Sequence, residues 1–211
     1  MTQEGIRAYM KAFFEKYYAQ QRAENEIFLK RPGVPAAMLA DGADSAQEWK
    51  IWKLIPVSES EYDIPQIEAK FGVSLPECVK AFFTTYHHFF EYPINSNPIG
   101  APFAEMERVM NSQLAANGYL PFLWRDDYFM LCMDLQNMPI EESCPVLCID
   151  SEMLWNSTDD WAMEYRKQHP EEDAEIPIIP KERLKPLMRP AADNFYAFLE
   201  GVLRGEIKPL C

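Results

Sequence analysis

Apolar and polar residues alternate along this chain with two different periods. Over the first twenty residues, apolar side chains recur every three or four positions with charged side chains between them, which predicts an amphipathic helix that faces the core. The segment from Ser74 to Glu77 has the pattern of a capping box and predicts the start of a second long helix. Helices are expected over residues 1–20, 63–72, 74–90, 102–118 and 191–203.

Short segments rich in β-branched and aromatic residues predict strands. They cover residues 49–55, 119–124, 128–135 and 145–149, and the last three are expected to form a meander. In the first, Trp49 and Trp52 fall on opposite faces because strand side chains alternate. One indole is then expected in the core and the other partly exposed, with burial of both as the alternative. Residues 157–175 are polar and acidic, and are expected to begin as a helix and end as a loop.

The net charge of −13 is concentrated in one part of the chain. Residues 1–60 hold eight acidic and eight basic side chains, whereas residues 126–175 hold fourteen acidic side chains against Arg166 and Lys167. Such a field repels the phosphates of nucleic acids and anionic lipids, and it attracts basic proteins. The composition therefore argues against direct nucleic-acid binding. A role in solubility alone is the alternative explanation of the acidity.

No motif in the sequence requires an enzyme. The eight glycines form no phosphate-binding loop, no serine lies in a G-x-S-x-G setting, and His87, His88 and His169 have no carboxylate or serine at a diagnostic spacing. Asp126 and Asp127 lie in a predicted hairpin turn and could bind a cation, although aspartate is also a common turn former. A hydrolase or metal enzyme that uses these two carboxylates is the alternative class. We expect no catalytic residue and no cofactor.

The cysteines bear on metal binding and on the compartment. Cys132, Cys144 and Cys148 are close enough in sequence for a metal site to be considered, but the chain has no C-x-x-C pair, so buried free thiols are expected instead. The odd total of five agrees with a reducing compartment. No apolar run approaches the ~20 residues that span a bilayer, and the first residues lack the features of a signal peptide. We expect a cytoplasmic protein without a transmembrane segment.

Four short segments together resemble the SUKH superfamily. Glu68, Gly72 and the pair Leu75-Pro76 are spaced as in its "E..yG..LP" hallmark. Residues 131–135 resemble its "l.lDl" strand, residues 145–150 its "PV...d" strand, and residues 194–199 its closing "sF..fL" helix. The segments occur in the family order and cover about residues 61–205. Because each motif is short, their shared order is the main evidence.

The N-terminal part resembles the Syd branch of this superfamily. It has the opening helix, the segment Gly33-Val34-Pro35, the tryptophan strand that ends at Pro56, and Phe82-Phe83-Thr84-Thr85 where Syd proteins have "FYTT". The strands between 128 and 150, the acidic segment and Trp155 are more similar to the immunity-type members. The resemblance implies an α+β fold, a single domain with helices packed on a mixed, largely antiparallel sheet. Residues 1–60 form its Syd-like N-terminal part and residues 61–211 its SUKH-like core.

The resemblance also implies a non-enzymatic protein-binding module. Immunity-type members block toxins, so the first expectation is a protein that neutralises a basic toxin domain, with nucleases as one class. The alternative is a Syd-like regulator that binds basic cytosolic loops of the SecY translocon, and thereby associates peripherally with the membrane. From charge and aromatic content we expect the partner contacts at Trp52, Asp126, Asp127, Glu152, Trp155, Asp159, Asp160 and Trp161.

Overall fold

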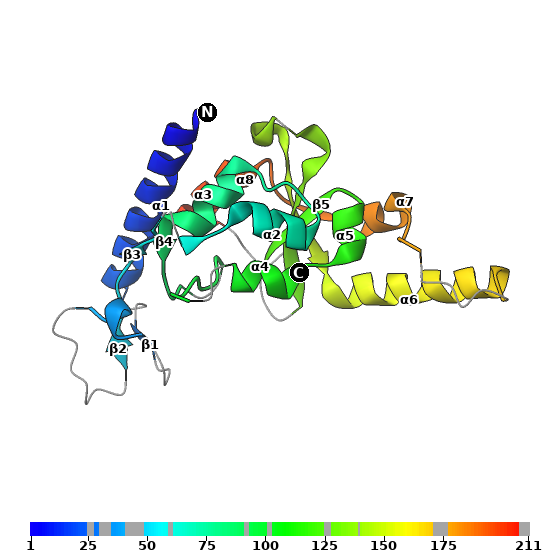
Figure 1. Cartoon of the computed structure of the whole chain (residues 1–211), viewed down its shortest axis with the longest axis horizontal. Coiled ribbons are helices and arrows are strands. Elements are labelled where there is room, and N and C mark those ends of the chain that lie inside the picture. The colour runs from blue at the N-terminus through cyan, green and yellow to red at the C-terminus, as the bar shows by residue number, and fades with distance from the viewer. Residues whose placement is uncertain are drawn as a thin grey trace.

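A computed structural model describes residues 1–24, 28–29, 35–40, 49–58, 61–90, 93–100, 103–124, 128–138, 140–170 and 177–206 (Figure 1). The strands are β1 (Phe28–Leu29), β2 (Lys50–Ile51), β3 (Ile55–Pro56), β4 (Tyr86–His87), β5 (Tyr119–Trp124), β6 (Phe129–Asp134), β7 (Val146–Asp150) and β8 (Arg189–Ala192). The α-helices are α1 (Gln3–Ala23), α2 (Ile64–Phe71), α3 (Glu77–Thr85), α4 (Ala104–Val109), α5 (Ser112–Ala116), α6 (Ser151–Gln168), α7 (Lys181–Leu184) and α8 (Phe195–Arg204). Short 3₁₀ turns are η1 (Ala36–Met38), η3 (Leu135–Asn137), η4 (Glu141–Ser143) and η5 (Lys185–Leu187).

The central sheet has four strands in the order β5-β6-β7-β8, and each pairing is antiparallel. The predicted α+β class and the predicted meander of β5, β6 and β7 are therefore confirmed. Two smaller antiparallel pairs, β1 with β2 and β3 with β4, lie outside this sheet. The expected single strand over residues 49–55 is thus wrong, because β2 and β3 pair with different neighbours.

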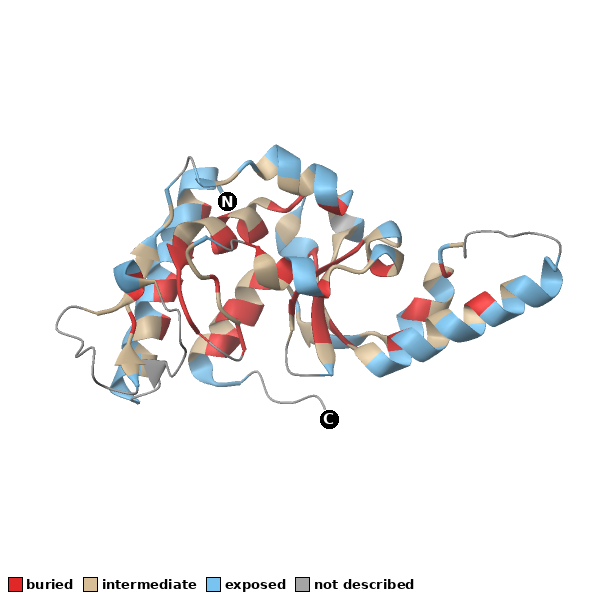
Figure 2. Ribbon diagram, turned by 60° about the horizontal axis from the view of Figure 1, so that its bottom comes forward, coloured by how far each residue is buried: buried red, intermediate tan, exposed pale blue. Residues whose placement is uncertain are grey.

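Both faces of the central sheet are covered by helices. Adjacent residues of one strand belong to different hydrophobic clusters: Leu131 packs with α1, α3 and α8, and Cys132 packs with α5, α6 and α7. Side chains alternate between the faces of a strand, so the two clusters lie on opposite sides of the sheet. This arrangement explains why β5, β6 and β7 read as nearly continuous apolar runs. The buried segments gather around the central sheet and in α1, α3 and α8, whereas α6 is largely exposed (Figure 2).

The N-terminal helix confirms the amphipathic pattern. Its buried residues are Ile6, Met10, Phe13, Phe14 and Tyr17, and they join the cluster formed with α3 and α8. Thr2 caps the helix by accepting a hydrogen bond of 3.2 Å from the Gly5 amide. Aromatic contacts extend this packing, since the Phe14 ring lies 5.2 Å from that of Phe82 in α3.

The third helix differs from its prediction at both ends. Ser74 does not cap it, since the residue before its first turn is Pro76. At the other end Thr84 and Thr85 donate their hydroxyl groups to the carbonyls four residues earlier, and Tyr86 turns into the extended conformation of β4. Pairing of β4 with β3 therefore replaces the last turn of the expected helix.

Two further boundaries also differ. The helix expected over 102–118 is split at Asn111, whose side chain caps α5 through the amides of Gln113 and Leu114. The edge strand β8 was not predicted, because Pro190 weakens the strand pattern and proline is tolerated at a sheet edge. Among the described helices, none combines the length and the apolar content needed to cross a bilayer.

Candidate functional site: the acidic helix α6

The helix α6 begins directly at the end of a central strand. Asp150, the last residue of β7, accepts hydrogen bonds through its Oδ1 from the amides of Glu152 (2.8 Å) and Met153 (3.1 Å). The helix thus starts six residues earlier than expected, because an aspartate at the strand end supplies its N-cap. From there α6 extends away from the sheet, with most of its surface exposed (Figures 1 and 2).

The outer half of α6 is held by the segment around α7. The indole Nε1 of Trp161 donates to the Pro177 carbonyl at 3.0 Å, and the Arg183 guanidinium lies 5.0 Å from the centre of the Trp161 ring. Arg183 also forms an ion pair with Glu164. Trp161 was expected to contact a partner, and this stays a prediction: the residue is partly exposed, while its N–H group and one ring face serve the attachment of α6 to its own chain.

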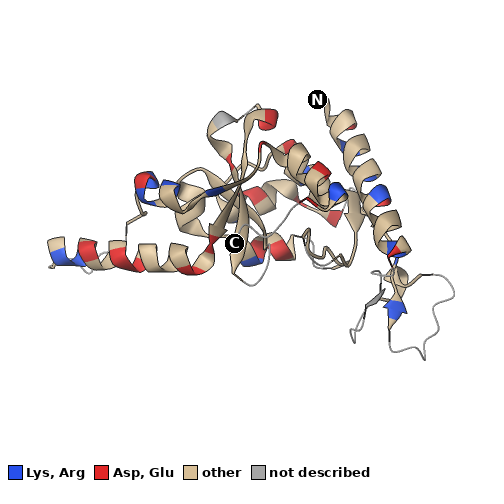
Figure 3. Ribbon diagram, turned by 180° about the vertical axis from the view of Figure 1, so that it is seen from behind, with Lys and Arg blue, Asp and Glu red and all other residues tan. Residues whose placement is uncertain are grey.

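Trp155 has the opposite environment. Its side chain is 71% exposed, the largest exposed fraction of any large hydrophobic residue in the described chain. Glu152 lies three residues before it and Asp159 four residues after it, which places all three on the same side of the helix. Asp160 is exposed as well. None of these three carboxylates forms an ion pair with a described residue, and all three are exposed on α6, with Glu152 and Asp159 beside the indole of Trp155. Figure 3 shows several acidic positions along this helix.

The other described acids of the acidic region have structural roles. Asp134 caps η3 through the Gln136 amide, and Asp150 caps α6. Glu142 lies 3.0 Å from the amino group of Met1. Glu141 accepts hydrogen bonds from the amides of Glu77 (2.5 Å) and Cys78 (3.1 Å). The described acids of this stretch are therefore of two kinds: those that cap helices or form ion pairs, and Glu152, Asp159 and Asp160 on α6, which remain available to a partner.

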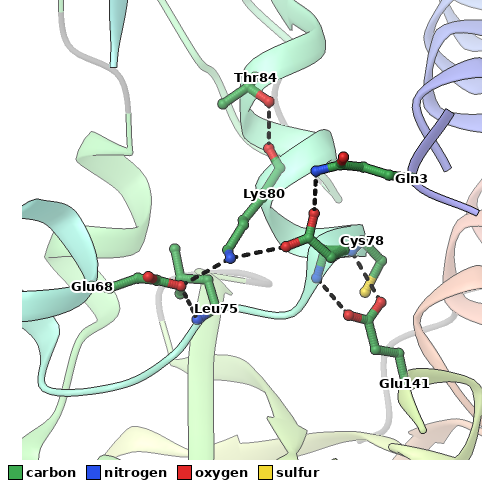
Figure 4. A network of polar contacts seen from close by, with 8 residues as sticks. Gln3, Glu68, Leu75, Cys78, Lys80, Thr84 and Glu141 are labelled. Carbon is green, nitrogen blue, oxygen red and sulfur yellow. Dashed lines mark hydrogen bonds and ion pairs between the residues drawn. The ribbon is translucent and has the colours of Figure 1, made fainter. Parts of the chain in front are cut away.

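Glu141 takes the place of the expected capping box of α3 (Figure 4). It reaches the first amides of this helix from η4, more than sixty residues further along the chain. Glu77 consequently does not reach back to Ser74, and instead accepts hydrogen bonds from Gln3 at 2.9 Å and Lys80 at 3.0 Å. Partial burial acts to raise the pKa of the Glu77 carboxyl, but the hydrogen bonds from Lys80 and Gln3 outweigh it and hold this pKa below its usual value.

The same network explains the geometry of the segment from Glu68 to Leu75. Glu68 accepts a hydrogen bond of 2.8 Å from the Leu75 amide and lies 3.1 Å from the Lys80 ammonium group. Gly72 ends α2 with a φ of 68°, a left-handed conformation that glycine adopts at little cost. Glu68 and Leu75 thus join α2 to the start of α3 (Figure 4), and Gly72 supplies the turn between them.

One buried polar cluster was not found by sequence reasoning. His87 is 1% exposed; its Nε2 lies 2.9 Å from Glu61 and its Nδ1 3.2 Å from the Asn97 carbonyl oxygen. The Tyr62 hydroxyl group is 3.4 Å from the same Nε2. These residues come from separate segments, so no spacing in the sequence predicts their contact. The imidazole itself is buried, whereas Glu61 and Tyr62 also line an open pocket of about 380 Å³.

The predicted partner contacts that remain are Trp52, Asp126 and Asp127. Trp52 is only 2% exposed and packs against Tyr18 and Phe90, so its expected role in partner binding is wrong. Trp49 is instead the exposed tryptophan of that segment, at 51%. The prediction that one indole is buried and the other exposed is confirmed, with the assignment reversed. Asp126 and Asp127 lie outside the described residues.

Among the described residues, no set of three or more histidine, cysteine, aspartate or glutamate side chains has the geometry to hold a metal ion. Cys132, Cys144 and Cys148 are buried free thiols, as expected, and so is Cys78. Burial raises the pKa of the Cys132 thiol well above its usual value, which keeps the thiol protonated.

An open pocket adjoins α6 on the side of Trp155. It has a volume of about 290 Å³ and lies between the first two turns of α6, the connection from α4 to α5, and the ends of β5 and β6. Trp124, Met130 and Leu154 contribute apolar lining. The indole Nε1 of Trp124 is buried and has no hydrogen-bond acceptor among the described residues.

Comparisons with known proteins identify no relative: no family model, no curated protein and no solved structure matches this chain. The site is therefore interpreted from its own residues.

Proposed function

We propose that this chain is a protein-binding module of the immunity type, which masks a basic toxin domain through the exposed face of α6. The observation that carries the proposal is the exposed indole of Trp155 with the carboxylates of Glu152 and Asp159 beside it and that of Asp160 further around α6, none of which forms an ion pair with a described residue. Exposed carboxylates attract a basic surface over a distance and accelerate its capture. An exposed tryptophan beside them supplies apolar area that a partner buries, as is common at the centre of protein interfaces.

The proposal assigns the chain a role in binding and not in catalysis. Two observations support this role. The described histidine that has a carboxylate partner is His87, and its ring is only 1% exposed. The carboxylates of Asp150, Glu152 and Asp159 near α6 cap the helix or face solvent. It also includes a cytoplasmic location. Four buried free thiols agree with that location, because reduced cysteines persist in a reducing compartment.

The experiment that tests this function starts from the gene neighbourhood. If a neighbouring gene encodes a basic toxin domain, co-expression of this chain in a bacterial host is expected to abolish toxicity, and the two purified proteins are expected to form a complex. The E152K/D159K/D160K variant is expected to lose protection. A neighbouring toxin that neither binds the chain nor is neutralised by it would contradict the proposal.

The second partner class implied by the sequence is tested in the same way. Basic cytosolic loops of the SecY translocon would meet the same acidic face. Sedimentation of the chain with SecY-containing membranes at low salt, without binding to any toxin domain, would replace the toxin by the translocon as partner. Protein-free anionic vesicles serve as the control, because an acidic chain is expected not to bind them.

A further inference from the structure

The pocket beside α6 has a largely apolar lining and lies next to exposed carboxylates of that helix. Trp124, Met130 and Leu154 line it, and the exposed ring of Trp155 stands at its edge. Glu152 and Asp159 do not line the pocket themselves; they lie about one turn before and one turn after Trp155 on α6, exposed and without an ion pair to any residue that the structure describes. An apolar side chain alone would fill the pocket but would not use this charge.

The positive group on the opposite side is already neutralised. Arg108 also lines the pocket, and its Nη1 donates hydrogen bonds of 3.1 Å to both carboxylate oxygens of Glu105. Among the described residues in or beside the pocket, the charges without an ion pair are therefore the carboxylates of Glu152 and Asp159. Charge complementarity therefore favours an occupant that has basic side chains near an apolar one.

The spacing of the two carboxylates fits a particular arrangement of such side chains. Glu152 and Asp159 are seven residues apart, which corresponds to about 10 Å along a helix. In an extended segment, the residues two positions before and two positions after a central residue point the same way as that residue and are about 13 Å apart. Long lysine or arginine side chains readily cover the difference.

We propose that this pocket receives one apolar side chain of an extended basic segment of the partner, with the pattern basic-x-apolar-x-basic. The central leucine, methionine or aromatic residue enters between Trp124 and Trp155, and the two flanking basic residues meet Glu152 and Asp159. This inference rests on the proposed function, because it specifies the chemistry that the α6 face recognises. It adds that the partner inserts an apolar side chain, which attraction between opposite charges alone would not require.

The Trp124 indole gives the proposal an observable signal. Its Nε1 is buried without an acceptor, and an unsatisfied buried donor is energetically costly. A small rotation of the ring would let this group donate to a backbone carbonyl of the bound segment. Occupation of the pocket is therefore expected to shift the indole N–H resonance of Trp124, which the W124F variant identifies.

The test is an NMR titration of the ¹⁵N-labelled full chain with three short peptides. The first is acetyl-Gly-Lys-Ser-Leu-Ser-Lys-Gly-amide, the second has alanine in place of leucine, and the third has glutamate in place of both lysines. The leucine peptide is expected to bind about tenfold more tightly than the alanine peptide, because three buried carbon groups distinguish them in a partly open site. It alone is expected to shift the Trp124 and Trp155 indole resonances.

Variants separate the pocket from the acidic face. W155A is expected to remove the preference for leucine over alanine, whereas M163A, which changes another exposed side chain of α6, is expected to keep it. Equal, salt-sensitive binding of the leucine and alanine peptides would overturn the apolar anchor and leave the acidic face as the binding surface. Equal binding of the lysine and glutamate peptides would overturn both the charge pattern and the proposed function. Absence of any shift with the leucine peptide would overturn the pocket.

Discussion

At the scale of single residues, carboxylates that look alike in the sequence have different environments. Glu141 and Glu142 are adjacent, yet Glu141 accepts two backbone hydrogen bonds from α3, and Glu142 is an exposed partner of the Met1 amino group. The sequence predicts where acidic residues concentrate. It does not predict which of them fold back as caps, because that depends on contacts between residues more than sixty positions apart.

This difference predicts the effect of removing each side chain. E141A is expected to lower the free energy of unfolding by about 1–2 kcal/mol, because two amides at the start of α3 lose their acceptor. E142A is the matched control and is expected to change it by less than about 0.5 kcal/mol, as for most surface substitutions. Urea unfolding at pH 7 measures both. Equal stability of the two variants would show that Glu141 is not the cap of α3.

His88 predicts a dependence of stability on pH. The ring is buried between Phe14 and Phe90, with each centroid 5.0 Å away, and neither nitrogen has a hydrogen-bond partner in the described chain. Burial, together with the neighbouring His87, lowers the pKa of His88 to about 3. Because the unfolded chain binds this proton near pH 6.5, the unfolded state holds more protons between pH 6.5 and 3, and the free energy of unfolding falls as the pH falls through this window.

The H88F variant tests this origin. Phenylalanine keeps the aromatic packing and removes the titrating group, so the loss of stability between pH 7 and pH 5 is expected to be smaller than in the wild type by about 2 kcal/mol. Urea unfolding at the two pH values gives this difference directly. Parallel losses in wild type and H88F would assign the pH dependence to other groups.

At the scale of elements, the strands were predicted better than the ends of helices. The strands β5, β6 and β7 are apolar on both faces, so composition alone reveals them. The end of α3 and the break between α4 and α5 depend instead on β4 pairing with β3 and on the Asn111 cap. Trp155 and Trp161 of α6 were both expected to contact a partner. The sequence does not distinguish them, because the difference comes from the contacts of Trp161 with residues 177–183.

The two tryptophans of α6 are expected to respond differently to removal. W161A loses the hydrogen bond to Pro177 and the contact with Arg183, so the amides of the outer half of α6 are expected to exchange with solvent at least tenfold faster. W155A removes a ring that is 71% exposed and is expected to leave these rates unchanged. Hydrogen exchange followed by mass spectrometry compares the variants. Identical protection in W161A and wild type would mean that other contacts hold the helix.

At the scale of the whole molecule, negative charge is exposed on one projecting helix, α6. Several described acids near the sheet, among them Asp134, Glu141 and Asp150, serve as caps, while α6 extends from the body (Figure 3) and carries the exposed carboxylates of Glu152, Asp159 and Asp160. Net charge and its position in the sequence predicted an acidic surface. The helix that carries it, its distance from the body and the pocket beside it became visible only in the folded chain.

The central claim is that this one face, and not the net charge, binds a basic partner. Two variants with the same change in net charge separate these explanations. E152K/D159K/D160K alters α6, and E4K/E24K/D193K alters exposed acids elsewhere. Each variant changes one acid in the first turn of a helix, Glu152 in α6 and Glu4 in α1, so the two are matched in this respect. Calorimetric titration of each variant with the toxin domain encoded beside this gene, at low and at moderate salt, measures the affinity. The α6 variant is expected to bind at least tenfold more weakly and with less dependence on salt, and the control variant within about threefold of the wild type. Equal weakening by the two variants would contradict the claim.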